Sequence, residues 1–330
     1  MINGKKIAFC TGISGQDGSY LAELLLEKDY EVYGMVRRHS DPKYTRIEHI
    51  LSHPQFHLVF GDLTDQTSLY TLIKEIQPDE IYHLGAMSFV FESWNSPEST
   101  NNINGQGTLR ILNAMKEYAP HARFYNAASS EMFGNVQETP QTEKTPLNSR
   151  SPYGTSKITA FNHTVNYRQS YNLFCCNGIL MNHESPRRGI EFVTRKITDG
   201  VARIKLGLTT ELVLGNIYSK RDWGHAKDYV YAMWLMLQQD QPDDYVIATG
   251  ELHSIMEFVE ESFNVAGITD WQQYVKSDPQ FMRPAEVNIL LGDYSKAKEK
   301  LGWTPTTTFK QLVKEMVLND INQLQIGIKK

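Results

Sequence analysis

The sequence has few cysteines, no excess of basic residues and no long apolar run. Its 330 residues include only three cysteines, Cys10, Cys175 and Cys176, whose spacing fits neither a metal site nor a disulfide framework. We interpret them as buried thiols in a reducing compartment, which predicts a cytoplasmic protein without a metal. The formal net charge of -5 argues against nucleic acid as the main partner. No segment reaches the ~18 continuous apolar residues of a membrane span, and the N-terminal residues lack the apolar stretch of a signal peptide.

The remaining composition is that of an ordinary globular chain, with 41% hydrophobic and 22% charged residues. From residue 6 to residue 180, strand-like and helix-like segments alternate, which predicts an α/β fold with a Rossmann-like, doubly wound parallel sheet. The predicted strands are 6–11, 30–36, 56–60, 80–84, 123–127 and 174–180, and the predicted helices are 19–28, 68–76, 104–118 and 152–171.

After about Met181 this alternation becomes irregular. We therefore predict a dinucleotide-binding domain over residues 1–180 and a smaller C-terminal α/β substrate lobe over residues 181–330. Strand-like pieces follow at 211–214, 245–248 and 287–290. Whether strands near 211–250 rejoin the first sheet stays open at this point.

A glycine-rich turn, Gly-Ile-Ser-Gly-Gln-Asp-Gly at 12–18, follows the first predicted strand and opens a predicted helix. Gly12 suits a tight turn, Gly15 a close approach to a pyrophosphate, and Gly18 the packing of helix on strand. Free N–H groups at the start of the helix favour a phosphate. The spacing is not the commoner GxGxxG, so a structural turn is the alternative. The candidate cofactor contacts in this turn are Gly12, Ser14, Gly15, Gln16, Asp17 and Gly18.

The residues after the second predicted strand favour NADP over NAD. A site that prefers NAD usually has an acidic residue there, whereas this chain has Arg37 and Arg38. Two guanidinium groups match the charge and shape of a 2′-phosphate, although an exposed basic loop is the alternative. Asp62, after the third predicted strand, is a candidate acceptor for the adenine amino group. The ends of the third and fourth predicted strands give the further cofactor candidates Asp62, Leu63, Leu84, Gly85, Ala86 and Ser88.

Tyr153 and Lys157 lie four residues apart in a predicted helix and so share one face. A nearby ammonium lowers the pKa of a tyrosine, which makes Tyr153 a candidate base for a hydroxyl undergoing oxidation. Ser129, at the end of the preceding predicted strand, can hydrogen-bond that hydroxyl. Glu131 indicates a second proton transfer, because hydride transfer from an alcohol needs no extra carboxylate. The alternative for Tyr153 and Lys157 taken alone is a surface pair on a helix. The alternative for Glu131 taken alone is a salt-bridged loop residue.

These motifs resemble the extended short-chain dehydrogenase/reductase family and, within it, the GDP-mannose 4,6-dehydratases. The segments of most specific similarity are 177–189, 192–197, 221–229 and 283–286. The resemblance implies conversion of GDP-mannose to GDP-4-keto-6-deoxymannose and water, by internal hydride transfer through bound NADP. It also implies a homodimer or homotetramer, with no membrane or nucleic-acid partner.

The resemblance further implies roles for individual residues. Ser129 would take the place of the family's threonine, Glu131 would be the acid/base, and Tyr153 and Lys157 would form the redox pair. His183 and Arg188 would add cofactor contacts. The implied contacts to the GDP-sugar are Ser88, Ser129, Glu131, Asn182, Val193, Lys196, Arg221, Arg283 and Glu286.

The chain also departs from the family's pattern. Asn-Ala-Ala-Ser-Ser-Glu at 126–131 replaces Gln-Ala-Ser-Thr-Ser-Glu, a tyrosine expected near Ser99 is absent, and the segment 268–282 is shorter.

Alternative functions remain. Another nucleotide-sugar epimerase or reductase of the same superfamily would share the fold, but its chemistry does not require Glu131. A non-catalytic NADP-binding protein would require neither Glu131 nor the pair Tyr153 and Lys157, all of which are present. A dehydratase with bound NADPH could also carry the product on to GDP-rhamnose.

Overall fold

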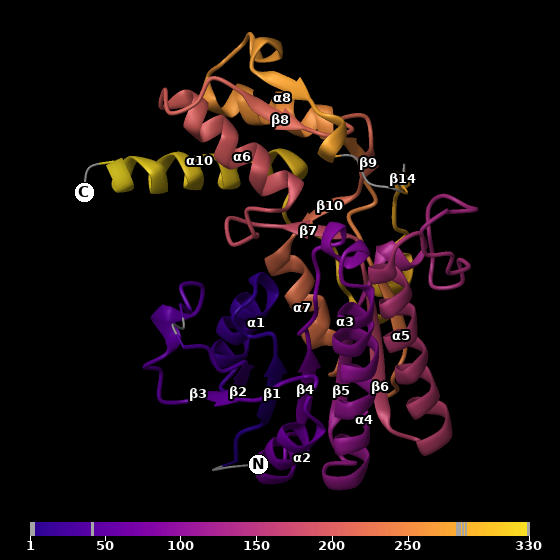
Figure 1. The fold of residues 1–330 in the computed structure, drawn as a ribbon. Coiled ribbons are helices and arrows are strands. Elements are labelled where there is room, and N and C mark those ends of the chain that lie inside the picture. The colour runs from indigo at the N-terminus through magenta and orange to yellow at the C-terminus, as the bar shows by residue number, and fades with distance from the viewer. Residues whose placement is uncertain (1–3, 41–42, 282–284, 286, 288, 329–330) are drawn as a thin grey trace.

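The computed structural model describes residues 4–40, 43–281, 285, 287 and 289–328. A seven-stranded sheet, parallel throughout, forms the centre of the molecule in the order β3-β2-β1-β4-β5-β6-β11, which confirms the predicted doubly wound fold (Figure 1). The strands are β1 Ile7–Thr11, β2 Glu31–Val36, β3 Phe56–Phe60, β4 Glu80–His83, β5 Arg123–Ser129, β6 Phe174–Leu180 and β11 Asp244–Ile247.

Helices cover both faces of this sheet, which is why the strands read as apolar runs rather than as alternating patterns. In β1, Ala8 and Cys10 belong to the core shared with α1 and α7, whereas Ile7 and Phe9 belong to the core shared with α2 and α4. The helices of these layers are α1 Gln16–Glu27, α7 Ala226–Met236 and α9 Ser295–Leu301 on one face, and α2 Gln66–Ile76, α4 Gly107–Tyr118 and α5 Pro152–Tyr171 on the other. The short helix α3, Pro97–Asn101, leads into α4 through a π-helical turn at Asn102–Gln106.

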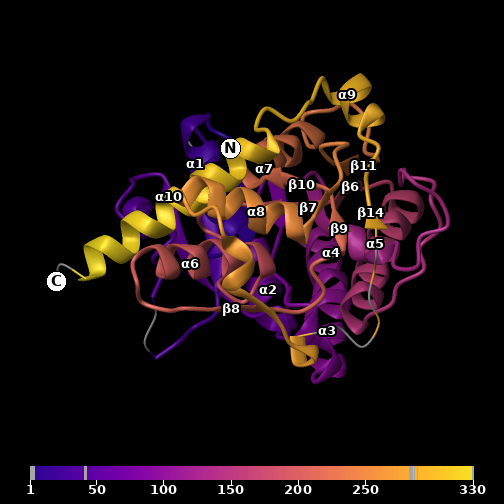
Figure 2. The same ribbon diagram turned by 90° about the horizontal axis from the view of Figure 1, so that it is seen from above.

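A second, smaller body lies at the carboxyl ends of the strands, above the sheet in Figure 1 and seen from above in Figure 2. Its core packs around Trp223, and the described residues of this core include none from the large sheet. Its helices are α6 Val193–Lys205, α8 Ile255–Ala266 and α10 Phe309–Ile328. Two small sheets belong to this body. In one, β8 Leu212–Leu214 pairs with β13 Val275–Ser277, and in the other, β9 Lys220–Arg221 pairs with both β12 His253–Ser254 and β14 Ile289–Leu290. Between the two bodies, β7 Asn182–Glu184 pairs with β10 Trp223–His225.

The late strand β11 returns to the large sheet and pairs with β6, whereas β8 stays in the smaller body. The chain therefore crosses between the two bodies more than once, and the domain limits at residues 180 and 181 stay a prediction. Within the described residues, no helix is both long and apolar enough to cross a membrane.

Candidate active site

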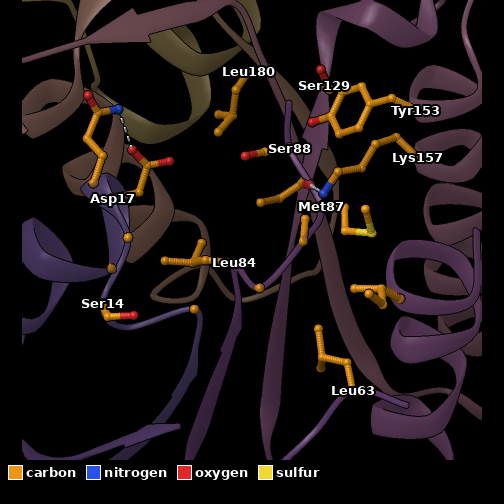
Figure 3. A pocket seen from close by; sticks show the side chains of 18 of the residues that line it. Ser14, Asp17, Leu63, Leu84, Met87, Ser88, Ser129, Tyr153, Lys157 and Leu180 are labelled. Carbon is orange, nitrogen blue, oxygen red and sulfur yellow. Dashed lines mark hydrogen bonds between the residues drawn. The ribbon is translucent and has the colours of Figure 1, made fainter. Parts of the chain in front are cut away.

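A cavity of about 450 Å³ opens at the carboxyl ends of the central strands (Figure 3). Parallel strands direct their following loops to this edge, so residues far apart in the sequence meet there. The predicted site residues that line it are Gly12, Ser14, Gly15, Gln16, Asp17, Gly18, Arg37, Asp62, Leu63, Leu84, Gly85, Ala86, Ser88, Ser129, Glu131, Tyr153, Lys157, Asn182, His183 and Arg188. Arg38, Val193, Lys196 and Arg221 lie outside this lining, and Arg283 and Glu286 fall outside the described residues.

The glycine-rich turn forms one wall, and two of its glycines, Gly12 and Gly18, leave no room for side chains. Gly12 has a φ of +70°, and a Cβ there would lie 2.7 Å from the backbone nitrogen of Gly85. A Cβ on Gly18 would lie 2.3 Å from the carbonyl oxygen of Gly12. Gly15 is the N-cap of α1, and among the described residues no side chain caps it. The N–H groups of the first turn therefore remain available to an anion in the cavity.

The strand-end loop after β4 is fixed by a residue that the sequence analysis missed. Asn104, almost fully buried in the π-helical turn before α4, accepts a hydrogen bond from the Met87 nitrogen over 2.8 Å and donates to the Met87 oxygen over 3.1 Å. Its Nδ2 also lies 2.9 Å from the Ser156 hydroxyl of α5. No sequence signal indicates this role, because the burial of the amide and its backbone partner are defined only by the fold.

Arg37 and Asp62 both line the cavity, within electrostatic reach of each other. Burial alone would raise the pKa of Asp62, but hydrogen bonds from Thr64 and the charge of Arg37 lower it. Arg38 is exposed. A cation and a carboxylate thus follow β2 and β3, where Rossmann folds hold the adenosine of a dinucleotide.

The catalytic candidates come from β5 and α5. The helix begins at Pro152, and the Ser151 hydroxyl accepts from the Gly154 nitrogen over 3.0 Å as its N-cap. A hydrogen bond with Ser129 acts on the Tyr153 hydroxyl, and Figure 3 shows the two side chains near each other. Lys157 donates to the Ala127 carbonyl over 2.8 Å, with its Nζ 5.9 Å from the centre of the Tyr153 ring.

Burial dominates the ionisation of this pair. It raises the pKa of Tyr153 to about 12, although the hydrogen bond with Ser129 acts in the opposite direction. Burial also lowers the pKa of Lys157 to about 8. The expectation that Lys157 would bring the pKa of Tyr153 down is therefore wrong for this structure. Removing a phenol from water disfavours its charged form more than the neighbouring groups favour it.

Glu131 lies beside Ser129 and is nearly buried. It sits in the 3-10 turn Ser130–Met132, where its nitrogen donates to the Ser129 hydroxyl over 3.2 Å. Its charge raises the pKa of Tyr153, which places the carboxylate within electrostatic reach of the phenol. Gly154 permits this arrangement, because a Cβ there would lie 2.6 Å from the Glu131 carbonyl oxygen.

The segment after β6 closes the cavity from the smaller body. Asn182 has a buried Oδ1 without a hydrogen-bond partner among the described residues, so it can still accept from a ligand. Arg188 pairs with Glu184 at 3.1 Å, and its guanidinium lies 3.6 Å from the centre of the Phe192 ring. Phe192, which the sequence analysis did not single out, also lines the cavity.

The other predicted substrate contacts that the structure describes, Val193, Lys196 and Arg221, lie in the smaller body. Val193 is the first residue of α6. Lys196, on the same helix, has its Nζ 3.4 Å from the centre of the Phe281 ring, and burial lowers its pKa. Arg221 is buried in β9 and donates to the carbonyl of Lys220 over 2.9 Å. These three residues are not part of the lining of the cavity that holds Tyr153, although Val193 directly follows the lining residue Phe192.

A glycine-rich turn on a doubly wound sheet, with a Tyr–Lys pair on the helix after β5, defines a dinucleotide-binding protein of the short-chain dehydrogenase/reductase type. The model of the family described as GDP-mannose 4,6 dehydratase matches residues 9–316. A GDP-mannose 4,6 dehydratase from Cricetulus griseus is 52% identical over 345 residues, which cover 97% of this chain and 93% of that protein. The chain belongs to the GDP-mannose 4,6-dehydratase family.

Solved structures show the same fold at lower identity. A dTDP-glucose 4,6-dehydratase from Bacillus anthracis in complex with NAD has a TM-score of 0.84 and 24% identity, and the match covers 97% of this chain and 98% of that one. RMD from Pseudomonas aeruginosa complexed with NADPH has a TM-score of 0.79 and 24% identity, covering 96% and 100%.

Proposed function

We propose that this protein is an NADP-dependent GDP-mannose 4,6-dehydratase, a carbon–oxygen lyase that forms GDP-4-keto-6-deoxymannose and water. The observation that carries the proposal is the position of Glu131. In a chain of this family, its carboxylate shares one buried pocket with Ser129, Tyr153 and Lys157. Oxidation of an alcohol alone needs only the hydroxyl and ammonium groups, whereas dehydration also needs an acid/base.

The cavity fits a dinucleotide. The uncapped start of α1 at Gly15 suits the pyrophosphate, and the absence of side chains at Gly12 and Gly85 leaves the path along the strand ends open. Arg37 supplies a cation for a 2′-phosphate, and Asp62 supplies an acceptor for an adenine amino group. This charge pattern supports NADP rather than NAD.

The chemistry supplied by bound NADP is the storage of a hydride, which leaves C4 of the mannose and later enters C6. Tyr153 takes the proton of the C4 hydroxyl, and Ser129 orients that hydroxyl. The hydrogen bond from Ser129 and the charge of Arg188 both favour the phenolate, against the effect of burial.

Glu131 performs the elimination. A ketone at C4 acidifies the proton on C5, which the carboxylate of Glu131 removes. The protonated Glu131 then donates to the departing C6 hydroxyl, which leaves as water. Tyr153 returns a proton to C5 at the end. Atoms and charges balance without an external oxidant or reductant, so the same NADP serves every turnover.

Ser88 and Asn182 are the proposed sugar contacts inside the cavity, and the unpartnered Oδ1 of Asn182 supports this role. We assign the guanosine diphosphate to the smaller body, where Lys196 and Arg221 provide positive charge and Val193 provides apolar contact. Arg283 and Glu286 complete this proposed set by resemblance.

The three cysteines are free and buried, which supports the proposed cytoplasmic location. The proposal of a homodimer or homotetramer rests on the resemblance. Size-exclusion chromatography with light scattering measures the oligomeric state.

The proposal is tested with the protein as purified, incubated with GDP-mannose and no added cofactor. Mass spectrometry should identify bound NADP and a product lighter than the substrate by one water. Folded, NADP-loaded protein that forms no such product contradicts the proposal. Addition of NADPH to the same reaction tests further reduction to GDP-rhamnose.

A further inference from the structure

Two segments far apart in the sequence meet across one wall of the cavity, the first turn of α1 and strand β7. Gln16 donates from Nε2 to the carbonyl of His183 over 3.1 Å, and Ser185 donates from Oγ to Gln16 Oε1 over 2.8 Å. Gln16 Nε2 also lies 3.0 Å from Asp17 Oδ1. These bonds join the glycine-rich turn to the segment that leads from the sheet into the smaller body.

His183 lies between two hydrogen-bond acceptors, so its ring must carry two protons. Nδ1 is 2.8 Å from the carbonyl oxygen of Met181, and Nε2 is 2.8 Å from Asp17 Oδ2. Neither a carbonyl nor an ionised carboxylate can donate. Burial raises the pKa of Asp17, but the charge and hydrogen bond of His183 outweigh it and the pKa is lowered. The pair is therefore an imidazolium and a carboxylate.

Several other groups surround this pair. Burial and the charge of Arg188 both lower the pKa of His183, yet Asp17 and the Met181 carbonyl raise it above its ordinary value. Tyr229 of α7 stacks on the imidazole at 4.6 Å and stays neutral, because burial raises its pKa well above the usual range. On the other side, Asp17 also acts on Tyr125 of β5 and on Tyr153 and Lys157 of α5.

The position of Asp17 needs an explanation. It lies in the first turn of α1, and Figure 3 shows it on the cavity wall opposite Tyr153 and Lys157. A carboxylate beside the proposed pyrophosphate position repels that anion unless a cation neutralises it. His183 supplies this cation and at the same time ties β7 to the turn.

We propose that Asp17 and His183 form a clasp that retains the dinucleotide, and that the clasp holds only while His183 carries both ring protons. The inference deepens the proposed function and rests on it, because it requires a dinucleotide in this cavity. Asp17 acts here as a positioning residue, through His183.

The clasp gives cofactor retention a defined pH dependence. The pKa of His183 is raised above 6.5, so the ion pair is complete below that value and is lost as the pH rises through the raised pKa. The pKa of Asp17 is lowered, so at the acid end the pair is lost only below the ordinary range of an aspartate. Release of NADP should therefore accelerate on the alkaline side.

The test compares the rate of NADP release from the wild-type holoenzyme and from His183→Gln between pH 6 and pH 10. Glutamine keeps an amide donor toward Asp17 but carries no charge. We expect release from His183→Gln to be about tenfold faster than from wild type at neutral pH, with the ratio falling toward one as the pH rises. Lys157, with a pKa of about 8, titrates in both proteins. The ratio of the two release rates therefore removes its contribution.

His57→Gln is the matched control. His57 pairs with Glu31 at the same 2.8 Å, but on strands β2 and β3 and outside the lining of the cavity. This variant should release NADP at the wild-type rate. Equal release from His183→Gln and wild type at neutral pH overturns the clasp, as does equal acceleration in both histidine variants.

Histidine NMR of the same proteins tests the charge of His183 separately from the effect of His183 on NADP release. The His183 ring should be doubly protonated at neutral pH in wild type and should titrate at or below 6.5 in Asp17→Asn. A neutral His183 in wild type at neutral pH overturns the clasp. A charged His183 without any effect of His183→Gln on release overturns the clasp alone, whereas protein that retains no dinucleotide in any variant overturns the proposed function as well.

Discussion

Among the side chains of the cavity, Glu131 separates dehydration from simple oxidation. Glu131→Gln keeps the shape of the side chain but removes its acid/base capacity. We expect the formation of 6-deoxy product to fall about 10²-fold or more, while oxidation at C4 continues. Rapid-quench analysis of GDP-mannose, with absorbance of the reduced cofactor, distinguishes the two steps. Glu117→Gln on the exposed side of α4 is the control and should behave as wild type.

Ser129 has a measurable effect on Tyr153. Its hydrogen bond lowers the pKa of a phenol that burial raises to about 12. Ser129→Ala should therefore raise that pKa further, lower kcat about tenfold at neutral pH, and move the alkaline rise of the pH–rate profile upward. Ser129→Thr keeps the hydroxyl and should retain the wild-type profile. An unchanged profile in Ser129→Ala would contradict the role assigned to this hydrogen bond.

Residue spacing predicted which side chains meet, but not their ionisation. Tyr153 and Lys157 share a helix face because of the helical repeat, and Ser129 and Glu131 follow a strand whose end lies at the cavity. The pKa of Tyr153 depends on how much water the folded chain excludes, which local spacing does not encode. Asn104 was missed because its partner, the backbone of Met87, carries no sequence signal.

At the scale of elements, the glycine-rich turn depends on close contact between backbones. A methyl group on Gly18 would lie 2.3 Å from the Gly12 carbonyl, so Gly18→Ala must displace either α1 or the turn. We expect loss of retained NADP and a decrease of about 2 kcal/mol in the free energy of unfolding. Gly327→Ala in α10, where a Cβ meets nothing within 4 Å, is the matched control. Thermal unfolding and nucleotide content of both variants measure the difference.

The elements of the first 180 residues were predictable because their strands are buried on both faces and alternate with long helices. The short helix α3 was not predicted, and neither was the π-helical turn at Asn102–Gln106, whose residues continue the helical pattern of α4. In the smaller body, the predicted strand-like piece 287–290 contains β14, but β9 and β12 are only two residues long. Such strands have no periodicity to detect, and only the tertiary arrangement defines them.

At the scale of the molecule, α10 is anchored to α6 by a buried ion pair near the cavity. Arg195 Nη2 lies 2.6 Å from Asp320 Oδ1, and Arg195 also donates to the carbonyl of Arg188 over 3.2 Å. Asp320→Asn leaves the guanidinium without its charge partner and should lower the free energy of unfolding by about 3 kcal/mol. The exposed Arg203–Asp199 pair provides the control, and Asp199→Asn should cost less than about 1 kcal/mol. Chemical denaturation measures both.

The central claim is that one cavity removes a hydride from C4 of GDP-mannose and returns it to C6 on the same molecule. GDP-mannose deuterated at C4, incubated with the purified protein and no added cofactor, tests this directly. The account predicts 6-deoxy product that carries the deuterium at C6, with retention of one label per molecule. Product without deuterium at C6, or a reaction that requires added NADP for every turnover, would contradict it.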